Sequence, residues 1–170
     1  CRSVGAATES KLEDVQAGIE RVQTLLPAVL SGVNLITCGG TLDSTMLESE
    51  AMLMLDDELC EAMLRMARGI EVNEENLSAA VIEEVIHGPG HFLGSQQTLE
   101  LMQKEYIYPD IGDRDTPDNW MDAGGKDALQ VAHERANELL ENHWPEHVSA
   151  DVDRKVRDAF NIVVKERPGL

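Results

Sequence analysis

Positive charge is scarce in this chain. Only 14 lysines and arginines stand against 32 aspartates and glutamates, which gives a formal net charge of −18 at pH 7. Nucleic acids and anionic membranes are bound by clustered basic side chains that offset phosphate charge. We therefore expect no nucleic acid and no membrane among the ligands, and a protein partner or a small molecule in their place.

Long apolar runs and a disulfide framework are missing as well. No stretch approaches the roughly 20 apolar residues that span a bilayer, and no apolar segment with a cleavage site opens the sequence. The three cysteines, Cys1, Cys38 and Cys60, are odd in number and widely spaced, which argues against paired disulfides. We expect a reduced, cytoplasmic protein.

A helix and a buried strand are predicted near the amino terminus. Ser10 and Glu13 have the spacing of a capping box, and apolar residues then recur at three- and four-residue steps as far as Gly32. Residues 33–37, VNLIT, are apolar without alternation. That pattern is typical of a strand covered on both faces.

The rest of the chain has helical patterns. Thr45 and Glu48 supply a second capping-box spacing before a helix that reaches about Arg68. The fold class expected from the pattern is mainly α with one or two short strands. Further helix starts are predicted at Asn73, Ser95 and Thr116, and apolar helix faces at 129–140 (before Pro145) and 152–163.

The segment after the predicted strand has the features of a binding site. The order helix, buried strand, glycine turn and helix is that of an α/β unit. In such folds ligands bind at the carboxyl ends of the strands. Residues 38–44, which begin with Cys38-Gly39-Gly40-Thr41, are therefore the backbone segment most suited to a site.

Residues 87–94, HGPGHFLG, permit three interpretations: a metal site, a phosphate loop, or a turn between helices. The glycine spacing does not match a dinucleotide fingerprint, and the segment follows a predicted helix instead of a strand. Gly88, Pro89 and Gly90 prevent a helix from placing His87 and His91 on one face. The pattern favours a helix end, a tight loop and a new helix, and no metal site is predicted in the chain.

Five segments, taken in order, resemble one known family. They are EDVQAG at 13–18, NLITCGGTLDS at 34–44, RGIEVNEENL at 68–77, GHFLGSQQTLELMQKEYIYP at 90–109 and AGGKDALQVAHERANELL at 123–140. Together they resemble the C-terminal third of the trimethylamine methyltransferase family, and we favour its branch without pyrrolysine, which is similar to glycine betaine methyltransferases. The resemblance implies a (β/α)8 TIM barrel about three times this length. Residues 1–68 would then be its last units, and residues 69–170 a C-terminal helical extension.

The resemblance also implies an activity. A corrinoid-dependent methyltransferase of this kind moves a methyl group from a tertiary or quaternary methylamine, of the trimethylamine or glycine betaine type, to the Co(I) of a corrinoid protein. The corrinoid would be carried by that partner protein, and this chain would bind no cofactor of its own. Aromatic residues make up only 4% of the chain, so an aromatic cage for a quaternary amine is expected elsewhere in the barrel.

The candidate site residues are assigned only from their position after the predicted strands. The residues expected to face the substrate or the corrinoid lie after the two strands: Gly5, Ala6, Gly39, Gly40, Thr41, Asp43 and Ser44. None is assigned a catalytic role. His91 is a candidate contact with a partner surface, and a homo-oligomer is left open.

A second hypothesis belongs to another class. The chain would be a stand-alone, acidic, helical module that binds a basic protein and catalyses nothing. The opening CRSVG, residues 1–5, lacks an initiator methionine and reads as a severed strand. That feature favours the fragment hypothesis, under which the 170 residues alone are expected to be inactive.

Overall fold

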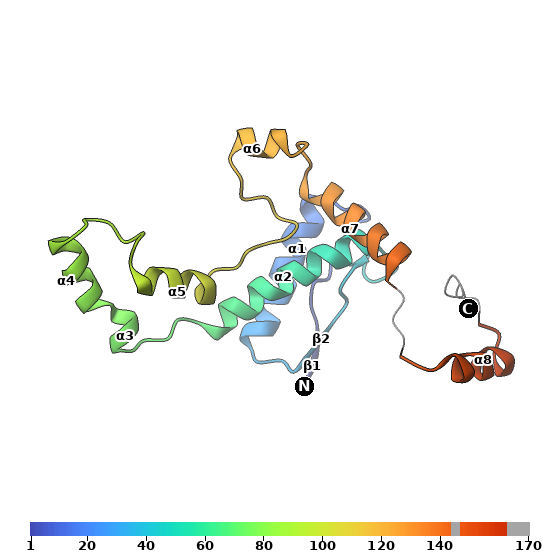
Figure 1. The fold of residues 1–170 in the computed structure, drawn as a ribbon. Helices are drawn as coiled ribbons and strands as arrows, with labels where there is room; N and C mark the ends of the chain where they lie inside the picture. The colour runs from blue at the N-terminus through green and yellow to red at the C-terminus, as the bar shows by residue number, and fades with distance from the viewer. Residues whose placement is uncertain (144–146, 163–170) are drawn as a thin grey trace.

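The computed structural model describes residues 1–143 and 147–162, and the predicted features at Pro145 and Val163 lie outside them. The chain is mainly helical, as expected, but it has four short strands where one or two were expected. The elements in chain order are β1 (Arg2–Val4), α1 (Val15–Leu30), β2 (Leu35–Thr37), β3 (Thr41–Leu42), β4 (Leu47–Glu48), α2 (Glu50–Arg68), α3 (Glu74–Leu77), α4 (Ala79–His87), α5 (Gln96–Glu105), α6 (Pro117–Asp122), α7 (Ala128–Asn142) and α8 (Ala150–Ala159). Figure 1 shows a central body from which α3 to α5 extend as an arm.

The body is built on a parallel pair of strands. β1 and β2 pair with Ser3 opposite Ile36, and α1 makes the crossover between them. The core beside them contains buried Ala6, Leu25 and Met63. The prediction that β2 is covered on both faces is wrong for the described residues, because Leu35 is 56% exposed.

Helix α1 begins later than predicted. Asp14, and not Ser10, is its N-cap, and the Asp14 carboxylate accepts a bond from Ala17 N. Ser10 supports this cap by donating to Asp14 Oδ1 at 2.9 Å. The buried face of α1 consists of Ala17, Arg21, Leu25 and Ala28, while the predicted apolar stripe is largely exposed, with Val15, Ile19 and Val22 at 79%, 53% and 38%.

A β-hairpin occupies the place where a helix start was predicted. Strands β3 and β4 pair in antiparallel register, and Thr45 lies in the turn between them with φ +74°. Helix α2 begins only after the hairpin, where the Ser49 side chain accepts from Met52 N. The end of α2 agrees with the prediction, since Gly69 closes it with φ +70°.

Helix α7 returns to the body and packs along α2. Its contact face includes Ala132 and Ala136, which are 0% and 5% exposed, in agreement with the predicted apolar face. A reciprocal capping box between Asp127 and Gln130 begins the helix. This part of the region after α2 is therefore packed on the body instead of standing apart from it.

The helix caps predicted at Asn73, Ser95 and Thr116 are confirmed to different extents. Asn73 and Thr116 accept from the amides three residues ahead, as predicted. The helix that follows Asn73 is broken by Ser78, whose φ of +57° separates α3 from α4. Ser95 is the N-cap of α5 without a side-chain bond. No helix within the described ranges has both the length and the apolar character to cross a membrane.

Candidate functional site

The loops that follow β1 and β2 lie against each other at the carboxyl ends of the two strands. Residues 5–14 and 38–49 form this area, which we call the strand-end surface. Two backbone bonds join the loops, from Asp43 N to Ser10 O at 2.8 Å and from Ser44 N to Thr8 O at 2.9 Å. Residues that are far apart in sequence are thereby held in one fixed surface.

A buried ion pair between α1 and α2 holds the two loops of the strand-end surface in place. Arg21 of α1 and Asp56 of α2 are both 2% exposed, with Arg21 Nε 3.3 Å from Asp56 Oδ1. Arg21 also donates through Nη1 to Ala6 O at 2.5 Å and through Nη2 to Thr41 O at 2.7 Å. Asp56 Oδ2 accepts from Gly40 N at 2.6 Å. The pair therefore links both helices to both loops.

The electrostatics of this pair suit a positioning role. Burial raises the pKa of the Asp56 carboxyl, while the Gly40 N–H and the Arg21 charge oppose that rise. Arg21 Nε and Asp56 Oδ1 form an ion pair, but neither atom has a hydrogen-bond partner. Because both side chains are almost fully buried and bond to the backbone of both loops, the pair fixes the geometry of that backbone.

Backbone strain is concentrated at the strand-end surface. Outside glycine, six described residues have positive φ, and five of these belong to this surface: Ala6, Cys38, Asp43, Ser44 and Thr45. Asp43 and Ser44, at +47° and +52°, make the tight turn of the β3–β4 hairpin. Such conformations cost free energy, persist only where the surroundings enforce them, and gather at functional sites.

Charged side chains occupy the edge of the surface. Lys11 Nζ lies 3.0 Å from Asp43 Oδ1, and the hydrogen bond with Asp43 raises the pKa of Lys11. Glu20 Oε2 accepts from Thr8 Oγ1 at 2.7 Å and from Glu9 N at 2.8 Å. These bonds, led by that from Thr8, lower the pKa of Glu20. The Glu20 carboxylate is thus held ionised next to the strand ends.

The prediction missed a contact from α7. His133 Nε2 lies 2.9 Å from Glu13 Oε2, and the other oxygen of Glu13 accepts from Ser49 Oγ. The Ser49 bond, followed by that of His133, lowers the pKa of Glu13. Glu13 and His133 are 120 residues apart. No local spacing could have indicated that this helix reaches the strand-end surface.

The predicted site residues are gathered at this surface, with one exception. Gly5, Ala6 and the residues from Gly39 to Ser44 all belong to it, while His91 lies on the arm between α4 and α5. Gly5 and Gly39 have internal packing roles: a Cβ on Gly5 would lie 2.6 Å from Ile36 Cγ2, and one on Gly39 would lie 3.3 Å from Leu53 Cδ1. Within residues 1–143 and 147–162, no group of three or more His, Cys, Asp or Glu side chains is arranged to hold a metal ion.

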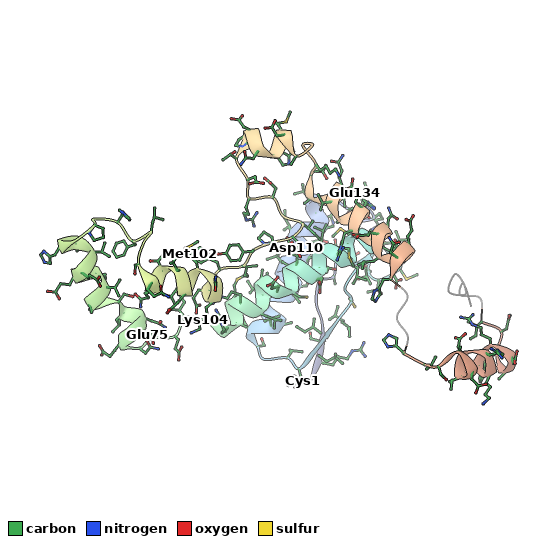
Figure 2. The ribbon with its side chains drawn as sticks, in the orientation of Figure 1. Cys1, Glu75, Met102, Lys104, Asp110 and Glu134 are labelled. Carbon is green, nitrogen blue, oxygen red and sulfur yellow. The ribbon has the colours of Figure 1, made fainter. Side chains whose placement is uncertain are left out.

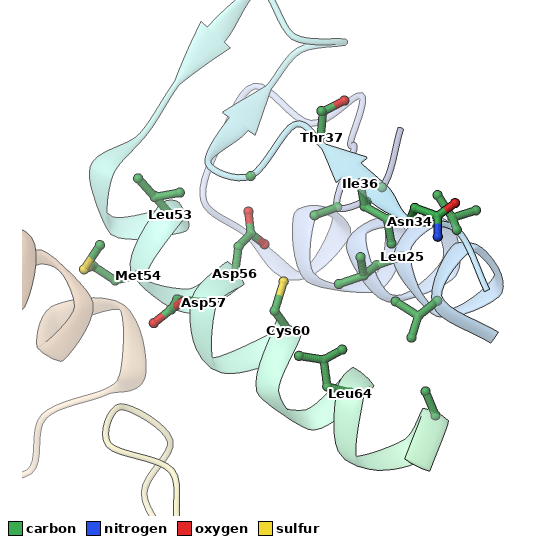
Figure 3. Close-up of a pocket in the computed structure, with 16 residues that line it drawn as sticks. Leu25, Asn34, Ile36, Thr37, Leu53, Met54, Asp56, Asp57, Cys60 and Leu64 are labelled. Carbon is green, nitrogen blue, oxygen red and sulfur yellow. The ribbon is translucent and has the colours of Figure 1, made fainter. Parts of the chain in front are cut away.

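A mainly apolar pocket of about 750 Å³ opens beside β2. Figure 3 shows Leu25 and Ile36 on one side of it, facing Cys60 and Leu64 of α2 on the other. Burial, followed by the charges of two nearby aspartates, raises the pKa of the Cys60 thiol, so the thiolate form is disfavoured. The mainly apolar lining of the pocket is suited to packing against other apolar side chains.

Comparison with known proteins identifies the family. Residues 1–167 match the family described as trimethylamine methyltransferase (MTTB). A glycine betaine methyltransferase of Desulfitobacterium hafniense (strain Y51) is 34% identical over 161 residues, which are 92% of this chain and 32% of that relative.

Two further relatives carry the other name. A trimethylamine methyltransferase MttB of Methanosarcina barkeri (strain Fusaro / DSM 804) is 34% identical over 87% of this chain and 30% of its own length. The MttB of Methanosarcina thermophila is 36% identical over the same shares. The chain spans about a third of the length of the curated relatives that it matches. The match across residues 1–167 shows that this chain belongs to the trimethylamine methyltransferase family.

Proposed function

We propose that this chain is part of a corrinoid-dependent methyltransferase. Its substrate would be a tertiary or quaternary methylamine, of the trimethylamine or glycine betaine type, and the methyl acceptor would be the Co(I) of a corrinoid bound to a partner protein. Support comes from the family match and from the names of the relatives. A quaternary amine is included because one relative of comparable identity is a glycine betaine methyltransferase.

We further propose that residues 1–68 are the last units of a (β/α)8 barrel and that residues 69–170 are its helical extension. The parallel β1–α1–β2 unit is the repeating unit of that fold. Two parallel strands are normally part of a larger sheet whose faces are both covered. The exposed side of Leu35 and the apolar pocket beside β2 would be covered by the preceding part of the barrel.

The observation that carries the functional proposal is the strand-end surface. Both strands direct their carboxyl ends to it, and the buried Arg21–Asp56 pair joins the two loops there. Active sites of barrel enzymes are built from such loops. In this arrangement the backbone of Gly39, Gly40 and Thr41 forms part of the proposed site, and the Arg21–Asp56 pair keeps that backbone rigid.

The charges at the edge of the surface fit a cationic substrate. Glu9, Glu20 and Asp43 lie on or beside the strand-end surface; Lys11 pairs with Asp43 there, and the charge of Arg21 below it is paired with Asp56. A negative potential raises the local concentration of a methylammonium cation and disfavours anions. Quaternary nitrogen leaves as a neutral amine once its methyl group is transferred. Alignment and charge complementarity are then the contributions required from the protein.

The test is methyl transfer by the full-length protein. Cobalamin reduced to Co(I) would be mixed with glycine betaine, trimethylamine and other methylated amines. Loss of the Co(I) absorbance together with a demethylated amine in the mass spectrum would support the proposal and name the substrate. Co(I) that survives the whole panel, both free and on a corrinoid protein encoded beside the enzyme, would overturn it. We expect residues 1–170 alone to be inactive, and transfer by that piece would contradict the barrel assignment without contradicting the activity.

A further inference from the structure

The Glu13 carboxylate joins three elements that are far apart in the sequence. Glu13 lies in the loop after β1, Ser49 is the N-cap of α2 at the end of the loop after β2, and His133 lies on α7. Oε1 of Glu13 accepts from Ser49 Oγ, and Oε2 lies 2.9 Å from His133 Nε2. Helix α7 is therefore linked to both loops of the strand-end surface through one side chain.

The direction of each hydrogen bond at Glu13 follows from its partners. Ser49 Oγ accepts from Met52 N at 3.0 Å as the helix cap, and its hydroxyl hydrogen is donated to Glu13. The bond from Ser49, followed by that of His133, lowers the pKa of Glu13. An ionised carboxylate can only accept. His133 therefore carries a proton on Nε2 and donates it to Glu13.

Polar contacts attach the region after α2 to the body at more than one place. Arg65 of α2 donates to Gly69 O at 2.9 Å and to Glu105 O at 2.8 Å, and these bonds hold the base of the arm to α2. The His133 contact differs from them because it reaches the strand-end surface. Figure 2 labels Glu134, the neighbour of His133, on the stretch of α7 that lies against the body.

The packing of α7 gives the His133 contact a fixed base. Ala132 and Ala136, on either side of His133 in the sequence, are 0% and 5% exposed where α7 packs along α2. The Glu13 side chain is 22% exposed, so water and salt screen its contacts less than those of a fully exposed pair. The bond between Glu13 and His133 is thus formed by side chains whose backbones are already held in place.

Ser49 connects this contact to the end of β2. Its N–H donates to Gly40 O at 2.9 Å, and Gly40 N donates to the buried Asp56 carboxylate. Two backbone bonds tie the turn of the β3–β4 hairpin to the loop after β1, and the bond between Glu13 and Ser49 ties the base of the hairpin to the same loop. A continuous series of hydrogen bonds therefore leads from His133 to the Gly40 backbone.

We propose that His133 is a positioning residue of the candidate site, a proposal that rests on the methyl-transfer function proposed above. Through Glu13 and Ser49 it restrains the Gly40 backbone, so its effect does not require contact with the reacting atoms. Methyl transfer needs the methylated nitrogen and the Co(I) to be aligned. A shift of the loops leaves the substrate bound but misaligned. Loss of the His133 bond is therefore expected to lower kcat with little change in KM.

The kinetic test uses the full-length protein with an amine and a corrinoid that support transfer. His133→Ala is expected to lower kcat about 10- to 100-fold, the range for a small misplacement of the reacting groups. His133→Gln keeps an N–H donor and is expected to recover most of that loss. Arg135→Ala is the matched control, because it breaks a pair with Glu138 inside α7, and it is expected to match the wild type. Adding His133→Ala to Glu13→Ala is expected to lower kcat no further, because both changes break the same contact.

Hydrogen exchange tests the same link without a substrate. Amides of residues 8–14 and 40–49 are expected to exchange faster in His133→Ala than in Arg135→Ala, and circular dichroism spectra like that of the wild type would show that both variants fold. Equal exchange in the two variants would overturn the proposal, as would an unchanged kcat in His133→Ala or a loss that His133→Gln does not restore. Wild-type protein that transfers no methyl group would refute the proposed function, and the exchange result alone would then decide whether His133 positions the loops.

Discussion

Replacing Arg21 by methionine tests the role of the buried ion pair. The change leaves the Asp56 carboxylate buried with one N–H donor, from Gly40, and leaves the carbonyl oxygens of Ala6 and Thr41 without their donor. Removing one partner of a buried pair costs about 3–5 kcal/mol. With an m-value of about 4 kcal/mol/M for a protein of this larger size, the urea midpoint of the full-length protein is expected to fall by about 1 M.

Two comparisons make the prediction specific. Adding Asp56→Leu to Arg21→Met removes the isolated charge, so the double variant is expected to be more stable than the single one. Arg135→Met is the matched control, because Arg135 is paired with Glu138 on the surface of α7. Exposed pairs of this kind contribute only about 0.2–1 kcal/mol. Equal midpoints for Arg21→Met and Arg135→Met would refute the assigned role of the pair.

The pH dependence supplies an independent check. Loss of Arg21 removes one of the effects that oppose the raised pKa of Asp56. A carboxyl whose folded pKa lies above its unfolded pKa binds its proton more tightly in the folded state, so stability falls as the pH rises through that interval. The deficit of Arg21→Met relative to wild type is therefore expected to shrink as the pH is lowered towards the ordinary carboxyl range. A deficit that is the same at every pH would show that the carboxylate is not its cause.

Three further changes test single contacts. Gly40→Ala is expected to cost about 1–3 kcal/mol, because Gly40 has φ +76° and a Cβ there would lie 3.2 Å from Ser49 O, while Gly69→Ala, at φ +70° with no atom within 4 Å, should cost less; urea midpoints measure both. Glu13→Gln is expected to speed amide exchange in α7. The folded pKa of Glu13 is lowered, so in the wild type the protection that the Glu13 carboxylate gives to α7 is present at neutral pH and is lost as the pH falls through that pKa. Glu58→Ala is expected to speed proteolysis after residue 105, because Glu58 accepts from the amides of Ile111 and Gly112 at 2.7 and 3.1 Å.

Each of these three predictions would be contradicted by a different result. Equal costs at the two glycines would mean that backbone conformation alone, and not the Ser49 carbonyl, restricts position 40. Exchange in α7 that is unaltered by Glu13→Gln would show that the apolar contact with α2 holds this helix unaided. For the loop, Glu61→Ala on the exposed side of α2 is the control, and equal cleavage of both variants would remove the anchoring role of Glu58.

Local signals were predicted well from the sequence. Asn73 and Thr116 cap helices because each side chain accepts from an amide three residues ahead, a contact that depends on neighbouring residues alone. Gly69 ends α2 because glycine adopts its φ of +70° without strain, which is also a local property. The position of the candidate site after the strands also followed from local order, since a strand followed by glycines is visible in the sequence.

Long-range contacts explain the failures. Ser10 and Glu13 have capping-box spacing, but Glu13 is engaged by Ser49 and His133, and Asp14 takes over the cap. The segment after Thr41 forms a hairpin because the loop after β1 pairs with its turn. Apolar periodicity was right only for the end of the α1 stripe, where Leu26 and Val29 pack against the core. It cannot anticipate that a charged residue, Arg21, lies at the centre of the buried face.

The bonds at the base of the arm have a consequence for folding. Since Arg65 holds both Gly69 O and Glu105 O, the two ends of a 35-residue excursion, residues 70–104, are brought together by one side chain. The entropy of closing such an excursion grows only with the logarithm of its length. The excursion can therefore lengthen, shorten or unfold as a separate cooperative unit at small cost to the rest of the molecule.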